Sequence, residues 1–267
     1  MDNGWNITVS FELEDNASSA SGNNMDSRSL KIDMGDAGTV TFSGHGGSTA
    51  ASAVDDVTPT AYGESWDVIG STTATQTNGG TNKHGAIGGF GDDNIFMYNA
   101  PSLVDGLGLN ISYVPSHTDR VGSSISWAVE YTGVEGLTLG YAVGEENAEG
   151  GTNNNDNDTY YIKYAYGPVT VGYQESERDN TAATNDDEFE AVGITYQVSD
   201  DLTIGYHEST FNDGNKSTDQ ENSNLSAAYT MGSMTLSVAF AEEKNRGGST
   251  KAADDVQGYA IDLAFAF

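Results

Sequence analysis

The chain has 267 residues, with ten Lys and Arg against forty Asp and Glu, and a formal net charge of -30. This surplus argues against a nucleic-acid partner, because phosphate binding requires clustered Lys and Arg. The mean hydropathy is -0.46, and without a run of about 18 apolar residues a transmembrane helix is excluded. A membrane-spanning β-strand is not excluded, since it needs only about 9 to 11 residues of alternating polarity.

Strands with one apolar face and one small or polar face recur along the whole chain. In residues 5–14, apolar and polar side chains alternate from Trp5 to Leu13. Successive side chains of a strand point to opposite faces, so this pattern predicts a strand. Thirteen further strands are predicted at residues 28–34, 39–43, 94–98, 107–113, 124–131, 137–143, 160–166, 169–174, 191–197, 202–207, 225–230, 234–241 and 257–267. The sequence therefore predicts an all-β fold with fourteen strands.

The last predicted strand ends on an aromatic residue. Tyr259, Ile261, Leu263, Phe265 and Phe267 alternate with small or polar residues. A terminal Phe on an alternating strand is typical of bacterial outer-membrane barrels. We therefore expect Phe265 and Phe267 to act as a signal for outer-membrane assembly.

The connections between the predicted strands alternate between short and long. Short links lie at residues 34–38, 99–105, 132–136, 167–168, 198–201 and 231–233, and longer polar ones include 145–158, 175–187, 210–224 and 242–255. Short turns on one side and long loops on the other are typical of a transmembrane antiparallel β-barrel. A soluble sandwich or lipocalin-like barrel would also alternate. However, the Gly, Ala, Ser and Thr of the second face suit a wet lumen better than a solvent-exposed surface.

The longest connection, residues 45–93, holds the acidic residues Asp55, Asp56, Glu64 and Asp67. Loops beyond about 15 residues are uncommon in compact folds and usually carry function. If this loop lies across a lumen, its carboxylates form the negative side of a constriction, where low-dielectric walls focus the field. The alternative is that they are ordinary solvated acids of an external loop.

Charged and polar residues of the predicted strands would line the wall of such a lumen. These residues are Glu12, Arg28, Lys31, Asp33, Lys163 and His207. Only three cations, Arg28, Lys31 and Lys163, are available to face the long loop, which is rich in acids, and Glu12 and Asp33 share their face. The sequence therefore predicts a lumen that prefers cations.

Catalysis and metal binding have little support in the sequence. The histidines His45, His84, His117 and His207 show no metal-ligand spacing. A Ser-His pair of the outer-membrane phospholipase type could use His84 or His207, but no nucleophile motif is present, so we expect no enzyme. The acidic run at residues 153–158 lacks the Gly of an EF-hand loop. We expect no cofactor, with Ca²⁺ bridging acidic loops as the alternative.

Three stretches resemble the general, non-specific porins of Gram-negative bacteria, most closely the alphaproteobacterial branch. They are GWNITVSFEL at residues 4–13, the strand, turn and strand at residues 29–42, and NIFMYNAPSLVDGLGLNISY at residues 94–113. With Phe267 the similarity spans nearly the whole chain. Two departures stand out. The match begins at the family's third strand, so its first two strands are missing from this sequence, and Met97 stands where relatives often place an Arg.

The resemblance implies a single porin barrel domain over residues 1–267, with sixteen strands in the complete family fold. It implies an inward-folding constriction loop at residues 45–93, a homotrimer, and an outer-membrane location among lipid and lipopolysaccharide. The implied function is passive diffusion of small hydrophilic solutes and ions. The alternatives are a substrate-specific channel, or a non-conducting barrel used for adhesion or surface structure.

Overall fold

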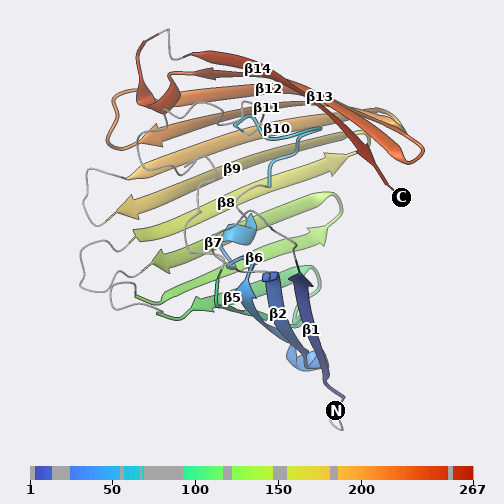
Figure 1. Ribbon diagram of the computed structural model, residues 1–267, viewed down its shortest axis with the longest axis vertical. Coiled ribbons are helices and arrows are strands. Elements are labelled where there is room, and N and C mark those ends of the chain that lie inside the picture. Colours follow the sequence, from blue (N-terminus) through green and yellow to red (C-terminus); the bar gives the residue numbers. More distant parts are fainter. Residues whose placement is uncertain are drawn as a thin grey trace. The chain divides into compact units, whose positions relative to one another are not determined.

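The computed structural model describes residues 4–13, 25–54, 57–66, 68, 93–116, 122–146, 155–180, 186–251 and 255–266. These residues form fourteen strands, which follow one another in the sheet in chain order (Figure 1). The predicted all-β fold and number of strands are confirmed. In the part of the chain described here, no helix is both long enough and apolar enough to cross a membrane.

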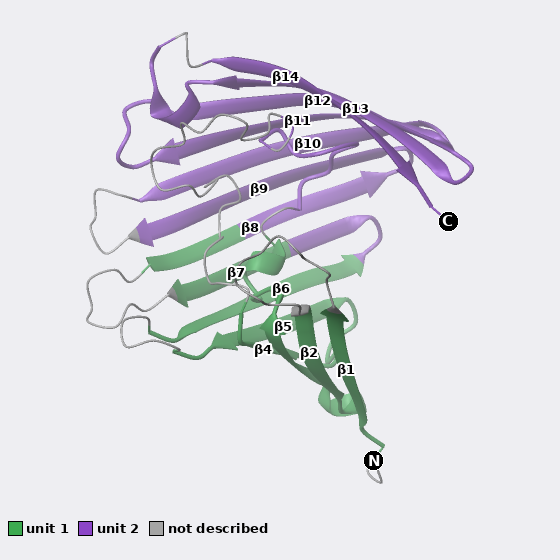
Figure 2. Ribbon diagram, in the orientation of Figure 1, with its two compact units in different colours: residues 1–55, 87–133, 140–159 green, residues 56–86, 134–139, 160–267 purple. Residues whose placement is uncertain are grey.

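The strands are β1 (Asn6–Leu13), β2 (Met25–Asp33), β3 (Thr39–His45), β4 (Ile95–Asn99), β5 (Leu107–Val114), β6 (Ser124–Val134), β7 (Leu137–Glu146), β8 (Asn155–Tyr166), β9 (Val169–Asn180), β10 (Asp187–Ser199), β11 (Leu202–Asp213), β12 (Gln220–Met231), β13 (Met234–Lys244) and β14 (Val256–Phe265). Three short helical turns accompany them: η1 (Gly35–Ala37), η2 (Ser52–Val54) and η3 (Arg246–Gly248). The chain divides into two compact units (Figure 2). Unit 1 comprises residues 1–55, 87–133 and 140–159, and unit 2 comprises residues 56–86, 134–139 and 160–267.

The strands of unit 2 present one bare apolar face. Across β11 to β14, the register aligns Tyr206, Leu225, Phe240 and Tyr259 in one row. These four side chains are 42%, 60%, 50% and 79% exposed. A soluble protein would turn such a row toward its core. The apolar face of this unit is therefore built to meet a medium other than water.

The opposite face of unit 2 is polar, and part of it is covered. One residue further along each strand, the register aligns His207, Asn224, Ala241 and Gly258. The first three of these side chains are at most 1% exposed. This face carries small and polar residues, as the alternation predicts, and it is here that other parts of the chain pack.

Unit 1 repeats the same division between two faces. Its apolar row runs across β1 to β6 through Val9, Leu30, Phe42, Phe96, Tyr113 and Ile125. Its polar row runs through Thr8, Lys31, Thr41, Met97, Ser112 and Ser126. In an antiparallel sheet, directly paired residues point to the same side. The two rows therefore lie on opposite faces of β1 to β6, and the face of any other residue in these strands follows from its alternation with them.

Several strands extend beyond their predicted ends on the long-loop side. β9 continues to Asn180 rather than residue 174, β11 continues to Asp213 rather than 207, and β8 begins at Asn155 rather than 160. The predicted loops at 145–158, 175–187 and 210–224 are correspondingly shorter than expected. Backbone pairing continues through polar residues, as between Glu177 and Glu188. Hydropathy alternation marks only the apolar band, so it underestimates strands that project beyond it.

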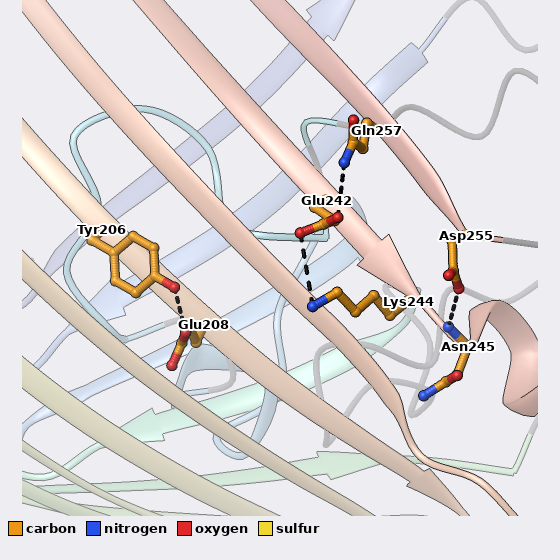
Figure 3. A network of polar contacts seen from close by, with 7 residues as sticks. All are labelled: Tyr206, Glu208, Glu242, Lys244, Asn245, Asp255 and Gln257. Carbon is orange, nitrogen blue, oxygen red and sulfur yellow. Dashed lines mark hydrogen bonds and ion pairs between the residues drawn. The ribbon is translucent and has the colours of Figure 1, made fainter. Parts of the chain in front are cut away.

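Polar contacts mark the end of the apolar face on β11 to β14 (Figure 3). The hydroxyl of Tyr206 donates to Glu208. On the next strands, Nε2 of Gln257 donates to Glu242 at 2.8 Å, and Nζ of Lys244 lies 3.9 Å from the same carboxylate. This row of carboxylates lies one step beyond the apolar row that contains Tyr206, because Glu208 and Glu242 share Ser223 as their cross-strand neighbour.

The short turns depend on glycines with positive φ. Gly136, between β6 and β7, has φ of 76°, and its carbonyl accepts the amide of Ala165 at 2.8 Å. A Cβ at Gly136 would lie 2.2 Å from the carbonyl oxygen of Ala165. Gly167 also has positive φ, 56°, but a Cβ there would meet nothing within 4 Å. Of these two residues, only Gly136 must be a glycine both for its positive φ and for the lack of space for a Cβ atom.

We predict that Gly136→Ala lowers the free energy of unfolding more than Gly167→Ala does. The control substitution costs only the left-handed backbone conformation, about 1–2 kcal/mol, whereas Gly136→Ala adds a steric overlap with Ala165. Equilibrium urea unfolding of the two variants measures the difference. Equal losses in the two variants would contradict the prediction.

Candidate functional site

A segment of the long connection packs on the polar face in both units. We call residues 49–54 and 57–66 the inner segment. In unit 1, the amides of Ala50 and Ala51 donate to the hydroxyls of Ser112 and Ser126, at 2.9 and 3.3 Å. Both alanines are fully buried. The two backbone amides that precede the helical turn η2 are thus satisfied by side chains of the sheet, which fixes this end of the inner segment.

In unit 2, residues 57–66 are held by amide and hydroxyl side chains of the wall. The amide of Val57 donates to Oε1 of Gln174 at 3.3 Å, and the amide of Tyr62 donates to Oγ of Ser226 at 3.3 Å. Nδ2 of Asn224 donates to the carbonyls of Tyr62 and Gly63, at 3.1 and 2.8 Å. Buried backbone groups of an irregular segment need hydrogen-bond partners, and side chains on the polar face of the sheet supply them.

His207 on β11 joins the two ends of this part of the inner segment. Its Nε2 lies 2.7 Å from Oγ1 of Thr58, and the amide of Ser65 donates to its Nδ1 at 3.3 Å. The side chain is fully buried. Beside it, the hydroxyls of Ser65 and Ser209 lie 2.8 Å apart. These contacts close residues 58–65 into a loop whose two ends meet at one imidazole.

Trp66 supplies the apolar part of the same anchor. Its ring packs edge-on against Phe189 and His207, with centroid distances of 5.2 and 5.3 Å. With Phe189, Ala191 and Phe211 it forms a buried apolar cluster on an otherwise polar face. Burying a large apolar side chain such as Phe typically stabilises by about 1.5–3 kcal/mol. The cluster therefore holds the end of the inner segment against β10 and β11.

Three glycines allow the backbone of the inner segment to approach the sheet closely. A Cβ at Gly172 would lie 2.4 Å from Cδ of Pro59, and one at Gly193 would lie 2.3 Å from the carbonyl oxygen of Pro59. A Cβ at Gly205 would lie 2.7 Å from the amide nitrogen of Ala61. Gly172 and Gly193 are directly paired. We call these three residues the glycine seat, because any larger side chain would displace Pro59 or Ala61.

The structure places most of the predicted lumen-wall residues on the polar face. Lys31 lies in the polar row of unit 1, and Asp33 lies two residues further on the same face, where its Oδ1 accepts the amide of Gly35 at 3.0 Å. Oε2 of Glu12 accepts the hydroxyl of Ser27 at 3.3 Å. Lys163 is half-buried two residues from Tyr161, which is 4% exposed. His207 lies under the inner segment, as described above.

The register bears on the face of Arg28. This residue lies opposite Phe11 and two residues from Leu30 on β2, both of which belong to the apolar face. Residues three apart on one strand point to opposite sides. By this pairing Arg28 lies on the other side of β2 from Lys31, next to a register shift between β2 and β3.

The remaining predicted residues are distributed as follows. Glu64 is half-buried within the inner segment. Phe265 lies opposite Met234 and is 53% exposed. His45, at the end of β3, is hydrogen-bonded to Asp93. Asp55, Asp56, Asp67, His84, His117 and Phe267 lie outside the described residues.

The structure tests the acidic run at residues 153–158 in part, and it adds anchoring residues that the sequence did not predict. Residues 155–158 of the acidic run belong to β8 rather than to a loop. Within the described ranges, no group of three or more His, Asp or Glu side chains could hold a metal ion. Sequence reasoning missed the residues that anchor the inner segment. The detectable signal was the glycine seat, because a Gly inside a strand often marks a close backbone approach.

A sheet that leaves its apolar face bare and packs a returning segment on its polar face defines a transmembrane β-barrel protein. The chain belongs to the Gram-negative porin family, whose model matches residues 1–264. It is therefore a protein of the Gram-negative outer membrane and a channel for passive diffusion. Members of this family are channels rather than enzymes.

Solved porin structures share the fold. The anion-selective porin from Comamonas acidovorans has a TM-score of 0.70 at 14% identity, over 100% of this chain and 86% of that one. OmpF of Salmonella typhi, in a complex with daunomycin, has 0.66 at 13%, over 97% and 85%. The trimer form of in-vitro folded OmpT from Vibrio cholerae has 0.54 at 14%, over 98% and 96%. No curated protein matches the chain.

We predict that Gly193→Ala displaces the inner segment. The new methyl group would overlap Pro59, and overpacking of this kind costs about 1–3 kcal/mol of unfolding free energy. Trp66, which is 8% exposed, should become more accessible, so its fluorescence should shift to the red.

The matched control is Gly108→Ala on β5, where the nearest atom to a new Cβ lies 3.9 Å away. It should leave both the unfolding free energy and the Trp emission close to the parent values. A Gly193→Ala variant that behaves like this control would contradict the existence of the glycine seat.

Proposed function

We propose that the chain forms a cation-preferring diffusion channel whose narrowest part is bordered by the inner segment. The observation that carries the proposal is the anchoring of this segment to the polar face by hydrogen bonds between neutral groups, in which Gln174 and Ser226 accept backbone amides and Asn224 donates to a backbone carbonyl. A segment held in this way restricts the water-filled side of the sheet. Its charged groups then lie along the path of permeating ions.

The sign of the preference follows from the charges on the polar face. Among the described residues, acids on this face include Glu12, Asp33, Glu130, Asp187, Asp213, Glu243 and Asp262. Cations on it include Lys31, Lys163 and Arg178. Met97 occupies an uncharged place in the polar row of unit 1. Acids therefore outnumber bases on the lining, and lining charge sets ion selectivity.

The inner segment adds further negative charge. Glu64 lies within it, and the sequence places Asp55, Asp56 and Asp67 in the same connection. The anion-selective porin from Comamonas acidovorans shares this fold. The fold therefore does not decide the sign of selectivity, and the residues of each lining do.

The same proposal extends to solutes and partners. A lining of Ser, Thr, Asn and Gln suits small hydrophilic solutes, which pass without strong binding. The bare apolar face suits outer-membrane lipid and lipopolysaccharide chains. A homotrimer is the proposed assembly, by analogy with the trimer form of Vibrio cholerae OmpT.

The test is the reversal potential of purified protein in a planar bilayer under a salt gradient. We expect the sign of cation preference, and a smaller preference for Glu64→Gln. The loss should be greatest at low ionic strength, because salt screens exposed charges over about 10 Å at 0.1 M. Glu188→Gln is the control, since Glu188 is exposed on the other face of β10, the face that carries Val192.

Anion preference of the parent protein would contradict the proposal. An equal effect of Glu64→Gln and Glu188→Gln would contradict the role of the inner segment. A protein that folds and inserts but gives no conductance would favour the alternative of a surface barrel.

A further inference from the structure

His207 on β11 bonds both ends of residues 58–65. Thr58 and Ser65 are seven positions apart, yet each contacts a different nitrogen of this imidazole. The ring is fully buried between the sheet and Trp66. The two ends of this part of the inner segment therefore meet at one side chain, while Asn224 and Ser226 hold its middle.

We infer that His207 positions the inner segment and thereby sets the width of the diffusion path, and that it does so only as a neutral imidazole. The effect of His207 on the width of the path rests on the proposed function of the inner segment. The effect of His207 on the position of the segment does not, and it can be tested without measuring conductance.

The hydrogen bonds assign the proton of the imidazole. A backbone amide can only donate, so Nδ1 must accept the amide of Ser65 and carries no proton. Nε2 then carries the ring proton and donates it to Oγ1 of Thr58, 2.7 Å away. A second proton on Nδ1 would face the Ser65 amide, leaving two donors opposed in a buried site. Protonation must therefore break the contact with Ser65.

The surroundings of His207 offer little compensation for a positive charge. Its paired neighbours on the sheet are Gly193 and Asn224, which are uncharged. On the elements packed around this face, the titratable and charged residues among those described are Tyr62 and Glu64 on the inner segment, Arg178 on β9, Asp187 on β10, Asp213 on β11 and Glu243 on β13. The groups that contact His207 directly, Thr58, Ser65 and Trp66, are neutral, and the nearest acid in the sequence of the inner segment is Glu64.

Release of Ser65 should detach the inner segment at one end. Residues 58–65 would then leave the glycine seat and move within the water-filled side of the sheet. The expected result is loss of the steady open level, with a lower mean conductance. Acidic pH should produce this state in the parent protein, whereas His207→Ala should produce it at every pH.

The first experiment compares single-channel records at neutral and acidic pH. His207→Gln keeps a donor and an acceptor but does not titrate, so its record should not change with pH in the way the parent record does. His45→Gln is the matched control. His45 lies in unit 1 beside Asp93, so its loss should leave the pH response unchanged.

The second experiment tests position directly with a tether. The chain contains no cysteine, and the hydroxyls of Ser65 and Ser209 lie 2.8 Å apart. The double variant Ser65→Cys with Ser209→Cys should form a disulfide on oxidation. Adding His207→Ala should lower the yield of this cross-link. Once formed, the cross-link should restore the steady open level, and reduction should abolish it again. Single Ser209→Cys serves as the control.

The outcomes separate the two proposals. If the parent protein does not conduct, the proposed function fails, while the yield of cross-link still reports on His207. If His207→Ala keeps the parent cross-link yield, the steady level and the pH response, the inference about His207 is overturned. Gel electrophoresis of unheated and heated samples of each variant shows whether it is folded, and so distinguishes these results from misfolding.

Discussion

The strongest constraint on this structure is the need to pair every backbone amide and carbonyl while exposing an apolar face. In a membrane no water is available for unpaired backbone groups, so they must be satisfied within the sheet. The continuous antiparallel ladders, such as those from β9 to β14, meet this need. With the backbone satisfied, one side of each strand can carry Leu, Tyr and Phe, and the other is free to carry small polar groups.

The small polar face in turn makes the inner segment possible. Hydroxyl and amide side chains bond its irregular backbone, and glycines let Pro59 and Ala61 reach the sheet itself. Most of these anchoring contacts join neutral groups, so they depend little on ionic strength. Charged residues such as Lys31 and Asp262 lie on the same face. This division lets one surface both fix the geometry of a channel and present a field to ions.

Much of the fold could be predicted from the sequence, because alternation is a local property. All fourteen strands, the tight turn after β2 and the long connection between β3 and β4 were identified from neighbouring residues. The strand ends were less accurate, since polar residues such as Glu177 continue the ladder without alternating in hydropathy. The face of Arg28 could not be read from its charge, because it depends on the pairing with Phe11 next to a register shift.

The anchoring contacts could not be predicted, because they join positions far apart in the chain. Thr58 and His207 are separated by 149 residues, and Asn224 and Tyr62 by 162. Their meeting depends on the register of several strands and on the path of an irregular segment. His207 was assigned to the polar face from parity alone, without its partners. The paired Gly172 and Gly193 gave a local sign of close approach, but not of what approaches.

The central claim is that the two faces of the sheet meet different media, lipid on the apolar side and water on the polar side. The most direct measurement is a cysteine scan of residues 259–264 in β14 of membrane-inserted protein, read with a charged, membrane-impermeant thiol reagent. Cysteines at Ala260, Asp262 and Ala264 should react, and those at Tyr259, Ile261 and Leu263 should not. Uniform labelling, or labelling of the second set alone, would contradict the account.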